Sequence, residues 1–87
     1  MAGKYRVQVA RSARKQLESL DNALIARIVS HIDALVNNPR PRGCRKLRGE
    51  NNLWRLRVGD YRVIYAISDR ERVVDISAVR NRREAYD

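Results

Sequence analysis

The segment WRLRVGDYRVIY, residues 54–65, constrains the fold of this chain more than any other part of the sequence. Two runs of alternating apolar and polar residues meet at a Gly-Asp pair, a pattern typical of a β-hairpin with a two-residue loop. Because a loop that begins with glycine favours a type II′ turn, the residues on either side of the pair should face each other. This register places Arg57 opposite Arg62, where like charges destabilise a sheet by up to about 1 kcal/mol.

The predicted register divides the hairpin into two chemically different faces. It pairs Leu56 with Val63 and Trp54 with Tyr65, so that one face is apolar. A three-residue loop would instead shift the register by one residue. The opposite face carries the following side chains: Arg55, Arg57, Arg62, Ile64 and Ala66.

A second hairpin is predicted from the alternation that continues to residue 79. A four-residue loop over residues 68–71 would pair Ile67 with Arg72. The arginine-bearing face then gains Val73 and Asp75, which is the only carboxylate of the last two strands on that side. The apolar face gains three side chains: Val74, Ile76 and Ala78.

The amino-terminal half predicts one strand and two helices. Residues 4–10 alternate in polarity as strands do. Ser12 is a candidate N-cap for a short helix, and Asp21 or Asn22 can cap a longer one with a clear apolar stripe. This longer helix must end near residues 37–38, because the proline that follows disfavours helical geometry in the residue before it.

Residues 37–52 are turn-rich and basic, with at most a short strand at 45–48. Three strands follow, at residues 53–58, 61–67 and 72–79. The order predicts a single α+β domain over residues 1–87, with two helices packed as a hairpin on one side of a sheet. A chain of 87 residues can bury one modest core.

The charge indicates a polyanionic partner. The net charge is +9, and only Lys4, Lys15 and Lys46 of the nineteen basic residues are lysine, which leaves sixteen arginines. The planar guanidinium suits bidentate recognition of phosphate. An arginine-rich codon usage, or a solvated face on which arginine stems cover apolar neighbours, would also account for many arginines. The solvated face accounts for one arginine better than for three converging ones, because acidic partners are scarce.

Several classes of function lack their residues in this sequence. It has no Ser-His-Asp or Cys-His arrangement, no P-loop, no paired carboxylates and no metal-ligand cluster. We therefore predict no metal and no cofactor. The lone Cys44 favours a reducing cytoplasm, and no segment has the roughly 18 to 20 apolar residues of a membrane span.

Cleavage of RNA by its own 2′-hydroxyl remains open to an arginine-rich site. Arginines can align the nucleophile and neutralise charge on the phosphorane oxygens. They are poor bases, since their pKa is at least about 12. Tyr86 is a candidate proton carrier, although a loosely packed aromatic residue near the chain end is an equal interpretation.

Three motifs together resemble the RelE/ParE superfamily of toxins from toxin–antitoxin systems: RKLRG at 45–49, WRLRVGDYRVIYAI at 54–67 and VRNRREAY at 79–86. The resemblance implies a β-α-α-β-β-β fold, with the helical hairpin packed on one face of a small twisted, mainly antiparallel sheet. RelE-like members cut mRNA in the ribosomal A site, whereas ParE-like members inhibit DNA gyrase.

The resemblance also implies roles for individual residues. The motif positions of RelE-like enzymes give the catalytic set Arg55, Arg57, Arg62, Arg82 and Tyr86. Further candidates for binding RNA or phosphate are Arg45, Lys46, Arg48, Arg80 and Arg83. RelE-like enzymes often carry lysine where this chain has Arg55 and Arg57. ParE-like proteins generally lack the full basic set, so the RelE interpretation is favoured over a gyrase inhibitor or a non-catalytic RNA-binding domain.

The implied partners are a ribosome with its mRNA and an acidic, RelB-like antitoxin. The arginine-bearing face leaves Ile64, Ala66 and Val73 where the two helices cannot cover them, and exposed apolar clusters often mark interfaces. We therefore predict that these three residues contact the antitoxin.

Overall fold

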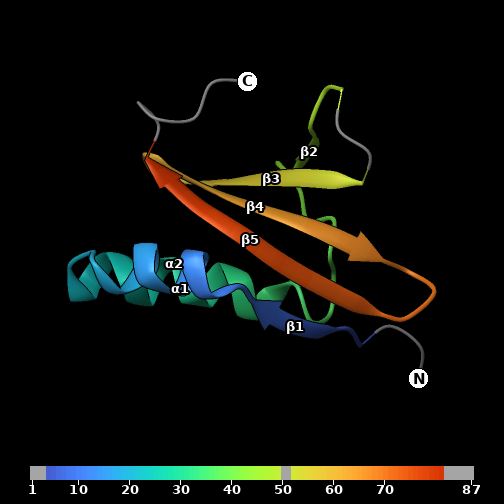
Figure 1. The fold of residues 1–87 in the computed structure, drawn as a ribbon, viewed down its shortest axis with the longest axis horizontal. Coiled ribbons are helices and arrows are strands. Elements are labelled where there is room, and N and C mark those ends of the chain that lie inside the picture. The colour runs from blue at the N-terminus through green and yellow to red at the C-terminus, as the bar shows by residue number, and fades with distance from the viewer. Residues whose placement is uncertain (1–3, 50–51, 82–87) are drawn as a thin grey trace.

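The computed structural model describes residues 4–49 and 52–81, which form two helices and a five-stranded sheet (Figure 1). The elements follow the chain in this order: β1 (Arg6–Val9), α1 (Arg11–Glu18), α2 (Asn22–Ala34), β2 (Arg45–Lys46), β3 (Leu53–Val58), β4 (Tyr61–Ser68) and β5 (Val73–Asn81). The strand order is β1-β5-β4-β3-β2, and only β1 runs parallel to its neighbour. The predicted α+β class and the short strand near residue 45 are confirmed.

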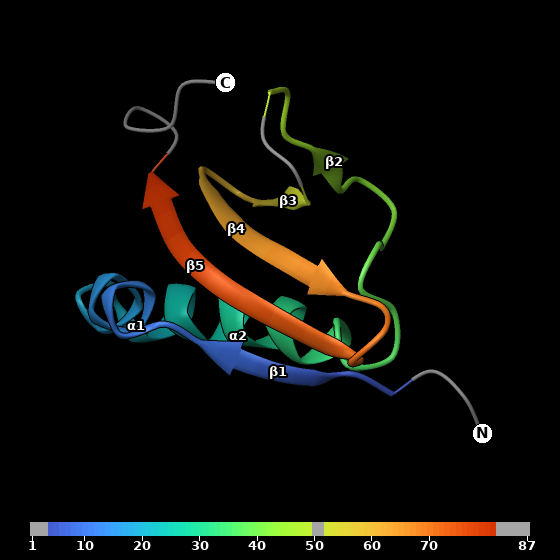
Figure 2. The same ribbon diagram turned by 45° about the vertical axis from the view of Figure 1, so that its right-hand side comes forward.

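Both helices pack against the same face of the twisted sheet, and the core lies between the two layers (Figure 2). The buried side chains come from both layers: Ala13, Ile28, Ile32 and Leu35 from the helical half, and Leu56, Val58, Val63, Tyr65, Ile67, Val74, Ile76 and Val79 from the sheet. Trp54 and Tyr61 are partly buried against this core, as the predicted apolar face requires. No helix in the described part of the chain is long and apolar enough to cross a membrane.

The helix ends differ in part from the prediction. Asp21 is the N-cap of α2, and its carboxylate accepts the N–H of Leu24 at 2.9 Å. Ser12 is not an N-cap, because α1 already begins at Arg11. α2 ends at Ala34, before the predicted residues 37–38, because the next three N–H groups bond three residues back and tighten the chain into a turn.

The first hairpin has the predicted register. Val58 faces Tyr61 and Arg57 faces Arg62, across a loop in which Gly59 has a φ of 60°. That backbone conformation favours glycine, because a Cβ atom would clash with the chain.

The predicted register of the second hairpin is wrong. Ile67 faces Val74 rather than Arg72, because the four-residue loop begins at residue 69 and not at residue 68. Ser68 stays in β4, and its Oγ accepts the N–H of Glu71 at 3.2 Å across the loop. Arg72 closes the loop with a φ of 56°.

A β-bulge in β5 changes the faces a second time. Tyr65 faces Ile76 and Ile64 faces Ala78, so Ser77 is an extra residue without an opposite. The prediction that Ala78 lies on the apolar face is therefore wrong. Ala78 shares the arginine-bearing face with Ile64, and Val79 takes the buried position at 3% exposure.

Asp69 joins three distant segments at the β4–β5 loop. Its carboxylate accepts a 2.6 Å hydrogen bond from the Tyr5 hydroxyl and two hydrogen bonds from the Arg40 guanidinium, at 3.1 and 2.9 Å. Arg40 also lies over the ring of Trp54, 5.0 Å from its centroid. The hydrogen bonds from Arg40 first, and then from Tyr5, lower the pKa of Asp69 to about 2.

We expect the Asp69→Asn substitution to cost less stability at pH 2.5 than at pH 6. The folded-state pKa lies below the value of about 3.9 for an unfolded chain. The contribution of Asp69 is therefore complete above about pH 4 and is lost as the pH falls toward 2. Because the ion pair is partly exposed, this contribution is at most about 1 kcal/mol.

Urea unfolding at both pH values measures this effect. Arg40→Gln is the matched control, since it breaks the same ion pair from the cationic side and should show the same pH dependence. An equal loss of stability at both pH values would contradict the prediction.

Candidate functional site

Three arginines form a row across the sheet face that the helices leave uncovered. Arg57 of β3 faces Arg62 of β4, and Arg62 faces Arg80 of β5. Side chains of directly opposed residues project from the same face, with Cβ atoms about 4.5–5.5 Å apart. We call Arg57, Arg62 and Arg80 the arginine row.

Two further arginines lie next to this row. Arg45 of β2 faces Arg55 of β3, and Arg55 faces Ile64 of β4. Arg55 and Arg57 are two residues apart in one strand, so they share a face. Four adjacent strands thus bring five cationic side chains onto one surface, which we call the arginine face: Arg45, Arg55, Arg57, Arg62 and Arg80.

The β-bulge is what adds Arg80 to this face. Without the extra residue Ser77, the alternation of β5 would put Arg80 on the side of Ile76, toward the helices. Bulges often redirect a side chain beside a functional site. The resemblance gave Arg80 a phosphate-binding role, but its place opposite Arg62 is a finding of the structure.

Mutual repulsion and burial act on the arginine face. Arg55 is half-buried, and its Nη1 atom is shielded from solvent. Desolvation, followed by the charges of Arg62, Arg45 and Arg57, lowers the pKa of Arg55. An anion bound here would reduce these repulsions, because it places negative charge between the guanidinium groups.

The remaining candidates lie elsewhere. Lys46 faces Trp54, which places its side chain on the opposite side of β2 from Arg45. Arg48 is exposed in the turn after β2. Arg82, Arg83 and Tyr86 lie outside the described residues.

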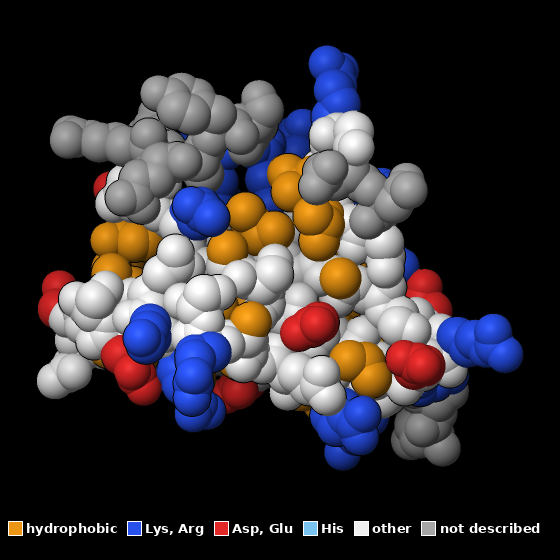
Figure 3. Space-filling view, in the orientation of Figure 1, with side chains coloured by type: hydrophobic (Ala, Val, Ile, Leu, Met, Phe, Trp, Pro, Cys, Tyr) orange, Lys and Arg blue, Asp and Glu red, His pale blue; other side chains and the backbone are white. Residues whose placement is uncertain are grey.

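An apolar strip runs along the arginine face. Ile64, Ala66 and Val73 are half-buried there, and Ala78 beside Ile64 extends the strip. Figure 3 shows hydrophobic side chains gathered across this side of the molecule with Lys and Arg side chains next to them. Sequence reasoning missed Ala78. The break in alternation at Ala78-Val79 was the available signal, because two consecutive apolar residues in a half-buried strand indicate a bulge.

Comparisons with known proteins agree on the family. The family model described as "ParE toxin of type II toxin-antitoxin system, parDE" matches residues 7–86. The toxin RelE of Mycobacterium tuberculosis is 34% identical over 84 residues, which cover 94% of this chain and 86% of that protein.

Solved structures match the fold over nearly the whole chain. The archaeal RelE–RelB complex from Pyrococcus horikoshii contains a chain with a TM-score of 0.83 and 36% identity, and the match covers 94% of this chain and 99% of that one. A toxin–antitoxin complex from M. tuberculosis contains a chain with a TM-score of 0.81 and 30% identity, with coverage of 94% and 95%. From its sequence, its sheet topology and these relatives, the chain belongs to the RelE/ParE superfamily and is a RelE-like toxin of a type II toxin–antitoxin system.

Proposed function

We propose that this toxin is an endoribonuclease that cleaves mRNA in the ribosomal A site. The observation that supports this most strongly is the arginine face, whose five guanidinium groups are held on four neighbouring strands. A fixed cluster of bidentate donors suits a phosphodiester, whose transition state carries more negative charge than its ground state.

The chemistry requires little from the protein beyond position and charge. The 2′-oxygen of the substrate attacks the adjacent phosphorus, and the bond from phosphorus to the 5′-oxygen breaks. The products are a 2′,3′-cyclic phosphate and a 5′-hydroxyl, so one proton leaves the 2′-oxygen and one reaches the 5′-oxygen. In this proposal Arg55, Arg57 and Arg62 bind the non-bridging oxygens, while Arg82 and Tyr86 belong to the same catalytic set and Tyr86 handles a proton.

The ribosome has a defined task in this proposal. In-line attack needs the 2′-oxygen, the phosphorus and the 5′-oxygen nearly collinear, and a flexible RNA strand rarely adopts this geometry. A codon held in the A site is ordered before the toxin arrives. Arg45, Lys46, Arg48, Arg80 and Arg83 then serve as additional contacts to the RNA backbone.

The proposed inhibitor is an acidic, RelB-like antitoxin. Two of the matching structures are described as toxin–antitoxin complexes, one of RelE with RelB. Ile64, Ala66 and Val73 offer apolar contacts on the arginine face, and the net charge of +9 favours an acidic partner. A target on the ribosome places the activity in the cytoplasm.

A gyrase inhibitor is the second candidate, because the matching family model describes a ParE toxin. Primer extension on a defined mRNA with programmed 70S ribosomes separates the two functions. Cuts within the A-site codon that are absent from naked RNA support the nuclease. Intact mRNA together with blocked supercoiling in a gyrase reaction overturns it in favour of the inhibitor.

We expect the Arg57→Lys substitution to raise the single-turnover cleavage rate. A lysine can give up its proton more readily than an arginine, so it can take part in proton transfer as well as in charge neutralisation. Quenched-flow cleavage with excess toxin over programmed ribosomes measures the chemical step. The Arg70→Lys variant, changed in an exposed loop residue, is the matched control; an unchanged or lower rate for Arg57→Lys contradicts the prediction.

A further inference from the structure

The bulge of β5 lies where the strand loses one of its two neighbours. β1 pairs with β5 only as far as Ile76, whose carbonyl accepts the N–H of Ala10 at 2.8 Å. Beyond this point the chain leaves the sheet to begin α1, which packs against β5 (Figure 2). The flank of β5 that leads to Arg80 is therefore next to a helix instead of a strand.

Side chains replace the missing strand at this flank. The Oε1 of Gln16, a half-buried residue of α1, accepts the N–H of Val79 at 2.8 Å. On the other side of the bulge, the Ser77 hydroxyl donates to the carbonyl of Ile64 at 3.2 Å. The Ser12 hydroxyl adds a longer contact of 3.5 Å to the carbonyl of Ser77.

These contacts hold the part of β5 that decides where Arg80 points. Val79 directly precedes Arg80, and its side chain is buried at 3% exposure. With Val79 fixed inward, the alternation of the strand directs Arg80 outward to the position opposite Arg62. A change of one residue in this register would exchange the two side chains between faces.

We propose that Gln16 and Ser77 are positioning residues that keep Arg80 in the arginine row. This inference rests on the proposed function, because it assumes that Arg80 contacts the RNA backbone. Gln16 lies on the helical layer, on the other side of the sheet from the arginine face, so it acts through the backbone of β5. The bulge thus turns a helix residue into a determinant of how many phosphates the opposite face engages.

The test is a double-mutant cycle on the salt dependence of RNA binding. The probe is a short unstructured single-stranded RNA, and the slope of log K against log salt counts the phosphates engaged. Arg80→Ala should reduce the magnitude of the slope by about 0.7, the value of one contact to a single strand. Gln16→Leu should reduce it by up to the same amount, and the double variant should show no further reduction.

Two further variants separate positioning from general stability. Gln16→Glu keeps an acceptor oxygen and should restore slow hydrogen exchange of the Val79 amide, which Gln16→Leu should speed up by about tenfold or more. Gln8→Leu, the same replacement at an exposed residue of β1, is the matched control and should change neither quantity. If Gln16→Leu does not fold, Ser77→Ala carries the same cycle from the other side of the bulge.

Each outcome supports or overturns a specific statement. Additive effects of Gln16→Leu and Arg80→Ala on the slope, or a Gln16→Leu slope equal to that of the unmodified chain, overturn the positioning role. A normal slope and normal mRNA cleavage in Arg80→Ala instead remove Arg80 from the RNA contacts of the proposed function, and the positioning role falls with it. A non-additive cycle with faster Val79 exchange supports the inference.

Discussion

Replacement of Arg62 by alanine is expected to slow single-turnover cleavage of ribosome-bound mRNA by about 100- to 1,000-fold. This is the usual effect of removing one preorganised donor that meets charge developing in a transition state. Arg62 is the central member of the arginine row, with Arg57 on one side and Arg80 on the other. A phosphate bound by the row would therefore lose its middle contact, and the two outer guanidinium groups are too far apart to replace it together.

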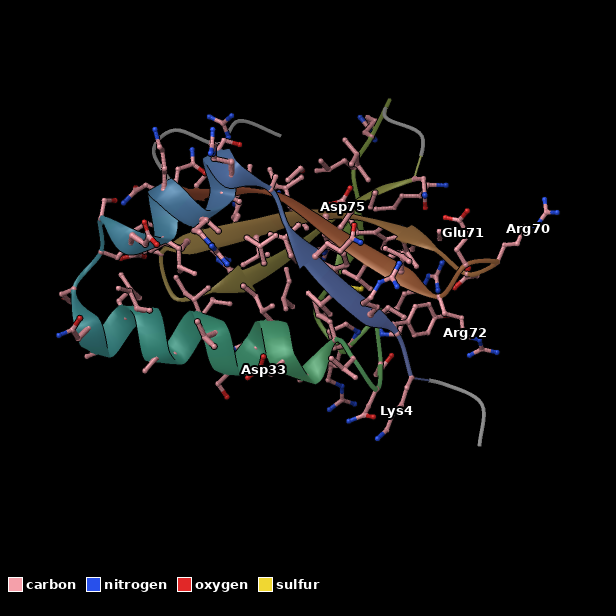
Figure 4. The ribbon with its side chains drawn as sticks, turned by 60° about the horizontal axis from the view of Figure 1, so that its bottom comes forward. Lys4, Asp33, Arg70, Glu71, Arg72 and Asp75 are labelled. Atoms are coloured by element: carbon pink, nitrogen blue, oxygen red, sulfur yellow. The ribbon has the colours of Figure 1, made fainter. Side chains whose placement is uncertain are left out.

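Arg70→Ala is the control for this experiment. It removes the same charge from an exposed residue of the β4–β5 loop, at the opposite end of β4 from the arginine row, where the side chain extends away from the sheet (Figure 4). We expect Arg70→Ala to cleave at nearly the rate of the unmodified chain. Equal losses in the two variants would mean that net charge alone matters, and full activity of Arg62→Ala would exclude it from the catalytic set.

The first hairpin was predictable because its physics is local. A Gly-first loop of two residues leaves one register, and a strict alternation on both sides agrees with it. The structure accordingly places Arg57 opposite Arg62, as the sequence predicts. The unfavourable pairing of like charges could be recognised from the sequence alone, before any side chain was located.

The second hairpin was less predictable because its loop has no comparable signal. Residues 68–72 contain no glycine, proline or asparagine, and the left-handed conformation falls on Arg72, a residue type that rarely adopts it. The bulge at Ser77 depends on contacts with Gln16, which is 61 positions earlier in the chain. Short-range patterns cannot predict such contacts, so the position of Arg80 opposite Arg62 required the structure.

The candidate site divides along the same line. Arg55, Arg57 and Arg62 were placed together by alternation within one hairpin, and the sheet register agrees. Arg45 joined them through a strand of only two residues, too short for periodicity to align it with β3. Their catalytic roles stay predictions, since register shows which side chains share a face and not which reaction they perform.

Replacement of Tyr65 by alanine is expected to have the largest effect on stability. Tyr65 is fully buried in β4, between β3 and β5, and its hydroxyl donates to the carbonyl of Pro39 at 2.9 Å. Burial raises the pKa of this hydroxyl above its ordinary value, which keeps it protonated as a donor. Loss of a large buried aromatic ring costs about 3–5 kcal/mol.

A domain of this size has a total stability of about 4–13 kcal/mol, so Tyr65→Ala should unfold a large fraction of the chain at 37 °C. The effect on stability is measured by urea unfolding followed by far-UV circular dichroism at 25 °C. Tyr65→Phe is the matched control: it keeps the ring and loses only the hydroxyl, which should cost about 1–3 kcal/mol because the carbonyl of Pro39 is left without its donor. If the two variants lost equal stability, the hydrogen bond and not the packing of the ring would hold the segment after α2 against the sheet. A loss in Tyr65→Ala at least about twice that in Tyr65→Phe places most of the energy in the core between the two layers.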